Sequence, residues 1–160
     1  MKFSKTVSAI ALAFCIYILP GQAASDPVKT AGVVCWTGEI EYLSTSEQDI
    51  AWVWTVNWNY MPDDRNMKNA STGRCLGSGG MIEGKPDVAN EFCIHNRRDD
   101  AKFMSQGQSS PKGSKAVMFG GTGSFAGVVG GWNGGERIDL PTGDGKLAGC
   151  RATSGEYTLK

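Results

Sequence analysis

The sequence predicts a small all-β protein that is cross-linked by disulfide bonds. Two observations lead to this fold class. Beyond residue 23, short apolar runs are separated by glycine clusters about every ten residues, which is the pattern of a β-barrel or β-sandwich, and no sustained helical period is present. Four cysteines follow an apparent export signal, and an even number of cysteines in an exported chain argues for disulfides.

Residues 1–23 have the three-part pattern of a cleavable signal peptide. Two lysines near the start precede an apolar run over residues 7–19, and a proline and small residues follow. We expect cleavage after Ala23. The apolar run is shorter than the roughly 20 residues that cross a bilayer, so no membrane span is expected after cleavage. Residues 24–160 are long enough for one domain, and we expect it to be periplasmic or extracellular.

The charge balance excludes one large class of function. The chain has 16 basic and 16 acidic residues. The signal peptide contains two of the lysines and no acid, so 14 basic residues remain against 16 acidic ones and the mature net charge is about −2. Without a basic surplus, a nucleic-acid partner is not expected.

The four mature cysteines are expected to form two disulfides. Three pairings are open; we favour Cys75–Cys93, which would close a local hairpin, and Cys35–Cys150, which would join the first and last strands. A metal site is not expected, because the chain has no C-x-x-C motif and its single histidine is His95.

The clearest strand is predicted over Ile50–Tyr60. Trp52, Trp54 and Trp58 fall on one side of it and Asn57 falls on the other. Strict alternation of aromatic and β-branched residues is a strong strand signal.

Further strands are predicted, about eight in all. They include Val33–Tyr42, Ala116–Phe119 and a last strand near Gly149–Leu159. We expect residues 24–31 to be a loose arm and residues 105–115 to be polar and flexible.

The glycine run Gly120–Gly127 (GGTGSFAG), followed by Val128-Val129-Gly130, resembles the "GGTG-x-aromatic-x-G-x-x-G" run of allene oxide cyclase-like and dirigent-like barrels, and of many exported bacterial proteins. The resemblance covers about 15 residues. It implies an antiparallel, eight-stranded, closed β-barrel around an apolar cavity, of a kind that often associates with other copies. Some members steer the cyclisation or coupling of reactive small molecules without a cofactor. No catalytic residue is transferred by it.

The same run formally matches the dinucleotide-binding pattern at Gly121-x-Gly123-x-x-Ala126. That pattern requires a helix to begin at the last small residue, and the Val-Val-Gly-Gly sequence that follows does not favour one. No cofactor is therefore expected.

Three ionisable residues are catalytic candidates. His95 could act as a general base oriented by Asp99 or Asp100, or it could simply end a strand beside a charged turn. Glu39 and Glu41 are two residues apart on one side of a strand, and could form an acid/base couple or belong to a solvated outer face.

The tryptophans allow three interpretations. They could fill the barrel, line a cavity with Asn57, Tyr60 or Glu39 as polar anchors, or form an outward patch for a partner. The expected ligand-binding residues are Trp36, Trp52, Trp54, Trp58, Asn57 and Tyr60.

The favoured function is therefore that of an exported barrel that binds a small apolar or aromatic molecule. The alternatives are a secreted protein that acts through its surface and a cofactor-independent cyclase, isomerase or lyase of the allene oxide cyclase-like type.

Overall fold

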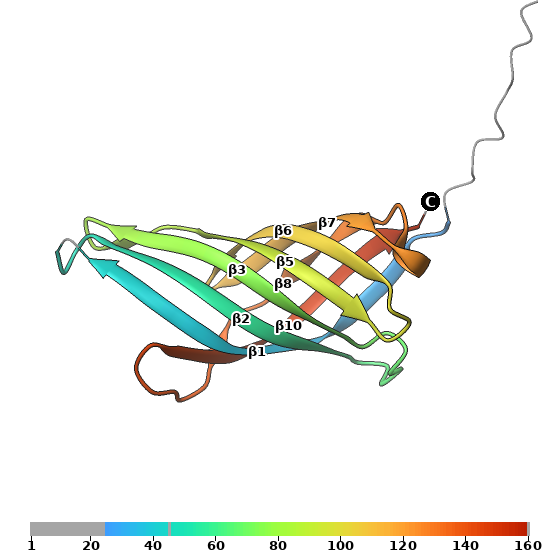
Figure 1. Cartoon of the computed structure of the whole chain (residues 1–160), viewed down its shortest axis with the longest axis horizontal. Helices are drawn as coiled ribbons and strands as arrows, with labels where there is room; N and C mark the ends of the chain where they lie inside the picture. Colours follow the sequence, from blue (N-terminus) through green and yellow to red (C-terminus); the bar gives the residue numbers. More distant parts are fainter. Residues whose placement is uncertain (1–24, 45, 160) are drawn as a thin grey trace, which may run out of the picture.

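The structure, a computed structural model, describes residues 25–44 and 46–159. The signal peptide expected at residues 1–23 lies outside these ranges. Figure 1 shows the strands wrapped into one elongated barrel. Within the described ranges, no helix is long and apolar enough to cross a membrane.

Ten strands and one 3₁₀ helix make up the described chain. In order they are β1 (Val28–Ser44), β2 (Ile50–Pro62), β3 (Ser71–Ile82), β4 (Lys85–Pro86), β5 (Ala89–Arg97), β6 (Lys102–Ser110), β7 (Gly113–Gly121), η1 (Gly123–Phe125), β8 (Val129–Gly134), β9 (Ile138–Asp139) and β10 (Lys146–Thr158).

Eight of these strands close into a barrel. The order is β1-β2-β3-β5-β6-β7-β8-β10, every neighbouring pair is antiparallel, and β10 pairs back onto β1. The two-residue strands β4 and β9 attach to β3 and β10. Because the ring is complete, the barrel has no free sheet edge. The predicted closed antiparallel barrel is confirmed.

Both favoured disulfides are present. Cys35 and Cys150 are direct partners across the β1/β10 seam, and Cys75 and Cys93 are direct partners on β3 and β5. The bonds span sequence separations of 115 and 18 residues. In the chain-entropy account, loops of these lengths correspond to about 5 and about 3 kcal/mol of stabilisation. The larger contribution therefore comes from the bond that holds the barrel closed.

Two segments expected to be irregular belong to the barrel. Strand β1 begins at Val28, which pairs with Tyr157, so the expected loose arm at residues 24–31 is partly strand. Residues 105–115, expected to be flexible, run through the β6–β7 hairpin. The inward face of β6 carries Phe103 at the start of the strand and then the small residues Ser105, Gly107 and Ser109, and small side chains suit the narrow inside of a barrel.

One end of the barrel is plugged by aromatic side chains. The chain leaves β7, turns through η1 and enters β8, and this places Phe125 inside with only 4% of its surface exposed. The ring of Phe125 stacks on that of Phe103, with 4.9 Å between the ring centroids. The ring of Phe103 in turn stacks on that of His95, with 4.2 Å between the centroids. The glycine run Gly120–Gly127 thus forms a tight bend. Gly123 has a φ of +57°, and a Cβ on Gly121 would overlap the carbonyl of Phe125.

The other end of the barrel is open to solvent. It carries the β1–β2 turn and the segment that joins β9 to β10, both at the end of Figure 1 opposite η1. The termini of the described chain meet at the plugged end, where the hydroxyl of Ser25 donates a hydrogen bond to the carbonyl of Leu159.

Candidate functional site in the barrel interior

The tryptophan face of β2 points into the barrel. Trp52, Trp54 and Trp58 line an interior cavity together with Tyr60. Asn57 lies on the opposite face and is exposed, so the expectation that it anchors a ligand is wrong. The interpretation of the tryptophans as an outward patch is excluded in the same way.

Every tryptophan of the chain lies directly opposite a glycine on a neighbouring strand. The pairs are Trp36–Gly149, Trp52–Gly79, Trp54–Gly77, Trp58–Gly73 and Trp132–Gly155. In the first four pairs a Cβ added to the glycine would meet the indole ring itself. These indole rings therefore pack on the backbone of the partner glycines, where no side chain intervenes. This contact fixes the orientation of the rings and holds them against the inner face of the sheet.

The space left inside is a cavity of about 480 Å³. This lies within the range of roughly 300–1,000 Å³ that is common for small-molecule sites. Its deep part is bounded by Trp58, His95 and Phe125, and its outer part by exposed residues such as Tyr42 and Pro86. The cavity is thus closed at the plugged end and reaches solvent at the open end.

His95 points into the barrel but is not placed for general-base catalysis near neutral pH. The ring is 6% exposed and its Nε2 hydrogen-bonds the hydroxyl of Ser105 at 2.8 Å. Burial lowers the pKa of His95 from 6.5 to about 3. The expected orienting residues lie elsewhere: Asp99 accepts a hydrogen bond from Ser124, and both Asp99 and Asp100 are exposed.

Glu39 and Glu41 lie on the outer face of β1 and are exposed. Glu39 forms an ion pair with Lys146, which lowers the pKa of its carboxyl. The expected acid/base couple therefore faces solvent and is not part of the cavity.

A different carboxyl occupies the interior. Glu91 on β5 lines the cavity, and one of its carboxylate oxygens lies within 4.8 Å of both sulfur atoms of the Cys75–Cys93 disulfide. Burial raises the pKa of Glu91, an effect that the charge of Arg151 partly opposes. A carboxyl with a raised pKa in an apolar cavity can carry a proton nearer neutral pH than an ordinary glutamate. Because the two sulfur atoms are bonded to each other, this group does not form a metal site.

Arg151 is the buried cation of the site. It lies on β10, is 5% exposed, and its guanidinium lies 5.4 Å from the ring centroid of Trp36. Its Nη2 donates to the carbonyl of Ser110 at 3.2 Å. Among the described residues, two buried side-chain nitrogens have no hydrogen-bond partner, Nη1 of Arg151 and Nε1 of Trp58. Both residues line the cavity.

The sequence analysis missed Glu91 and Arg151. Glu91 could have been found by parity, because it is two residues from Cys93 and four from His95 and so shares their face of the strand. Arg151 carried no such signal, since an isolated arginine in a strand is usually solvated.

The expected polar anchor Tyr60 does line the cavity. Its hydroxyl donates to the carbonyl of Ala31 at 2.9 Å, and burial raises its pKa. The phenol group is thus already hydrogen-bonded within the barrel wall.

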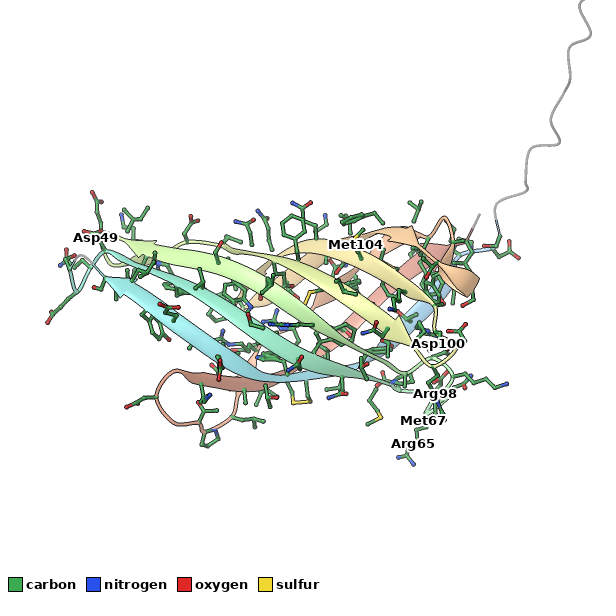
Figure 2. All side chains as sticks on the ribbon, viewed as in Figure 1. Asp49, Arg65, Met67, Arg98, Asp100 and Met104 are labelled. Carbon is green, nitrogen blue, oxygen red and sulfur yellow. A yellow bond between two sulfur atoms is a disulfide. The ribbon has the colours of Figure 1, made fainter. Side chains whose placement is uncertain are left out.

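The outer wall carries an apolar patch of its own. It spans the outward faces of β3, β5, β6 and β7 and consists of Leu76, Phe92, Ile94, Met104, Val117 and Phe119, each between 37% and 58% exposed. In Figure 2, Met104 lies on the outside of the barrel, between the ends marked by Asp49 and Asp100. The patch is separated from the cavity by the sheet.

Comparison with known proteins supports the architecture. No family model matches the chain, and no curated protein matches it. Among solved structures, a pterocarpan synthase dirigent protein is similar, with a TM-score of 0.53 and 10% sequence identity over 98% of this chain and 100% of that one. At this identity the likeness concerns the fold alone. The chain thus has a dirigent-like closed barrel, and the allene oxide cyclase-like part of the resemblance stays a prediction.

Proposed function

We propose that this protein binds a small, largely apolar or aromatic molecule inside its barrel. The observation that carries the proposal is the cavity of about 480 Å³, whose wall includes all five tryptophans of the chain. A cavity that opens to solvent at one end can admit a ligand, and flat aromatic walls suit a flat apolar one.

The rigidity of the wall supports the proposal further. The indole rings are held over glycines on neighbouring strands, and one disulfide ties two strands of the wall together. A site that is formed before the ligand arrives loses little side-chain freedom on binding, and this favours affinity. We place this activity in the periplasm or outside the cell, which accords with the two disulfides.

The proposal predicts that N-phenyl-1-naphthylamine, an uncharged fluorescent aromatic probe, binds the purified oxidised protein. Titration should give a saturable rise in probe fluorescence together with quenching of the tryptophans. Ala89 lines the cavity and is 9% exposed, so Ala89→Leu places three extra carbons inside the cavity. We expect this substitution to weaken binding by about ten-fold or more.

The matched control is Asn90→Leu, one residue further along β5 on the exposed outer face. This variant adds a larger apolar side chain but leaves the cavity unchanged, so its affinity for the probe should equal that of the wild type. Absence of saturable binding by the wild-type protein, or equal weakening by both substitutions, would contradict the proposal. Thermal unfolding of each variant shows whether it is folded.

A further inference from the structure

We propose that the ligand is a small aromatic acid whose carboxylate is held by Arg151. This inference rests on the proposed function, and it adds the chemical class of the molecule. Arg151 would bind the carboxylate through its guanidinium, while the rest of the ligand lies along the tryptophan wall. The evidence is the hydrogen-bonding state of the cavity.

Arg151 has an unused donor in a place from which water is largely excluded. One of its nitrogens donates to the carbonyl of Ser110, and its guanidinium carbon lies over the ring of Trp36. Nη1 is buried and has no partner within the described chain. A buried donor without an acceptor costs free energy, more so when the group is charged. A ligand oxygen at this position would remove that cost.

The other cations along the cavity are already engaged. Arg97 donates to the carbonyls of Lys68 and Asn69, at 2.7 and 2.8 Å. At the open end, Arg137 forms an ion pair with Asp139, and Lys146 pairs with Glu39. Among the described residues, Arg151 is thus the cavity-lining cation with a buried nitrogen that has no hydrogen-bond partner.

Glu91 does not neutralise Arg151 by direct contact. The two residues lie on β5 and β10, which are opposite each other in the eight-strand order. The charge of each affects the pKa of the other, but the ion pairs found in the described chain do not include them. Both residues line the same cavity.

The second unused group points to the same ligand chemistry. Nε1 of Trp58 is also a buried donor without a partner, and Trp58 lines the same cavity as Arg151. Both unused groups therefore require acceptors. A carboxylate offers two oxygens with about four acceptor positions and a negative charge. A neutral carbonyl would satisfy a donor but would bring no negative charge to Arg151.

The test compares two probes of the same shape, 2-naphthoate and 2-naphthamide, on the oxidised full-length mature protein at neutral pH. Competition against N-phenyl-1-naphthylamine gives both dissociation constants. We expect the acid to bind about ten- to 100-fold more tightly than the amide, as for a charge-assisted hydrogen bond formed in a buried site.

Substitution then assigns the preference to a residue. Arg151→Met keeps an unbranched apolar side chain against Trp36 but removes the charge, so the dissociation constants of the acid and the amide should become similar. The control is Arg74→Met, the same change on the exposed outer face of β3, which should leave all three affinities unchanged.

The failures of the two proposals are distinguishable. If the uncharged probe binds but wild-type protein does not prefer naphthoate to naphthamide, the inference about the acid is overturned and the binding function stands. If none of the three probes binds, the binding function itself fails. The wild-type comparison decides the inference even when Arg151→Met does not fold, and a preference for the acid that persists in folded Arg151→Met would also overturn the role of Arg151.

Discussion

His95 is an interior residue whose surroundings hold it uncharged. Its ring stacks on Phe103 and lies 4.5 Å from Trp58 and 5.0 Å from Trp132, between centroids. The hydrogen bond to Ser105 satisfies one of its nitrogens. Proton uptake would place a charge in this apolar layer, and this is why burial lowers the pKa to about 3. The residue contributes to packing and to the dependence of stability on pH.

We predict that His95 makes the protein less stable in acid. In the unfolded chain a histidine has a pKa near 6.5 and in the folded chain this one has a pKa of about 3, so between these values the unfolded state binds more protons. The free energy of unfolding should therefore fall as the pH falls below about 6.5, by about 1.4 kcal/mol per pH unit from this residue. Denaturant titrations at several pH values measure the slope.

The variant His95→Gln isolates this contribution. Glutamine keeps a polar partner for Ser105 but does not titrate. Glu91 acts in the opposite direction, because its raised pKa makes the folded state bind more protons above the ordinary pKa of a glutamate. The difference in slope between the two proteins, rather than either slope alone, is the quantity of interest. If the free energy of unfolding depended on pH in the same way in the wild type and the variant, the prediction of a lowered pKa for His95 would be contradicted.

At the residue scale, the alternation of side chains between the two faces of a strand explains which site residues the sequence could predict. The alternation of Trp52, Trp54 and Trp58 identified one face of β2 correctly, and the structure shows that this face is the inner one. On β1, Cys35 and Trp36 point to opposite faces and both looked buried in the sequence. The assignment of Glu39 to the inside or the outside was therefore open, and the structure places it outside.

At the scale of the strand, tryptophan and glycine act as a pair between β2 and β3. The rings of Trp52, Trp54 and Trp58 occupy the space that side chains at their partner glycines would fill. Cross-strand neighbours of this kind stabilise a sheet through contact on one face. Substitution of such a glycine should displace the ring that lies on it.

We predict that Gly77→Ala destabilises the protein by about 1–3 kcal/mol, the usual cost of overpacking. A methyl group at this position would overlap the indole of Trp54. The change should also shift the tryptophan fluorescence, since one cavity-lining ring must move. Unfolding in denaturant, followed by tryptophan emission, measures both effects.

The matched control is Gly80→Ala on the same strand. A Cβ there would meet only the carbonyl of Ile50, at 3.4 Å. Without a ring to displace, this substitution should be close to neutral or slightly stabilising, because alanine restricts the unfolded chain. Equal destabilisation by the two substitutions would mean that the loss of glycine itself matters, rather than the overlap with Trp54.

The same pairing explains why β3 was not predicted as one strand. Its sequence has glycines at positions 73, 77, 79 and 80, and glycine is depleted in strands. The sequence therefore indicates only two short strands here, at Arg74–Leu76 and Met81–Gly84. Continuity comes from the tryptophans of β2, a partner that single-sequence patterns do not identify. The β6–β7 hairpin was predicted only in part, as a strand at Ala116–Phe119, because the inward residues Ser105, Gly107 and Ser109 of β6 are small.

At the scale of the whole molecule, the barrel is a container with one closed end. The Cys35–Cys150 bond ties its first and last strands, the stack from His95 to Phe125 fills one end, and the other end opens to solvent. The closed antiparallel architecture and both disulfides could be predicted, because cysteine number, strand rhythm and the glycine run are visible in a single sequence. The presence of Glu91 and Arg151 in one cavity could not be predicted, because it depends on β5 and β10 lying opposite each other in the closed barrel.

The outer apolar patch is the competing place for an apolar molecule to bind. It shares strand β5 with the cavity, so Phe92 and Ile94 point outward while Ala89 and Cys93 point inward. Fluorescence alone does not separate the two faces of one strand. A measurement that reports which methyl groups touch the bound molecule does.

The most direct test is therefore the measurement of nuclear Overhauser effects between bound N-phenyl-1-naphthylamine and the methyl groups of the protein. We predict contacts from the probe to the methyls of Val56 and Ala89, which line the cavity, and none to those of Leu76 and Ile94 on the outer patch. Contacts to Leu76 and Ile94 without contacts to Val56 and Ala89 would contradict the claim that the barrel interior is the binding site.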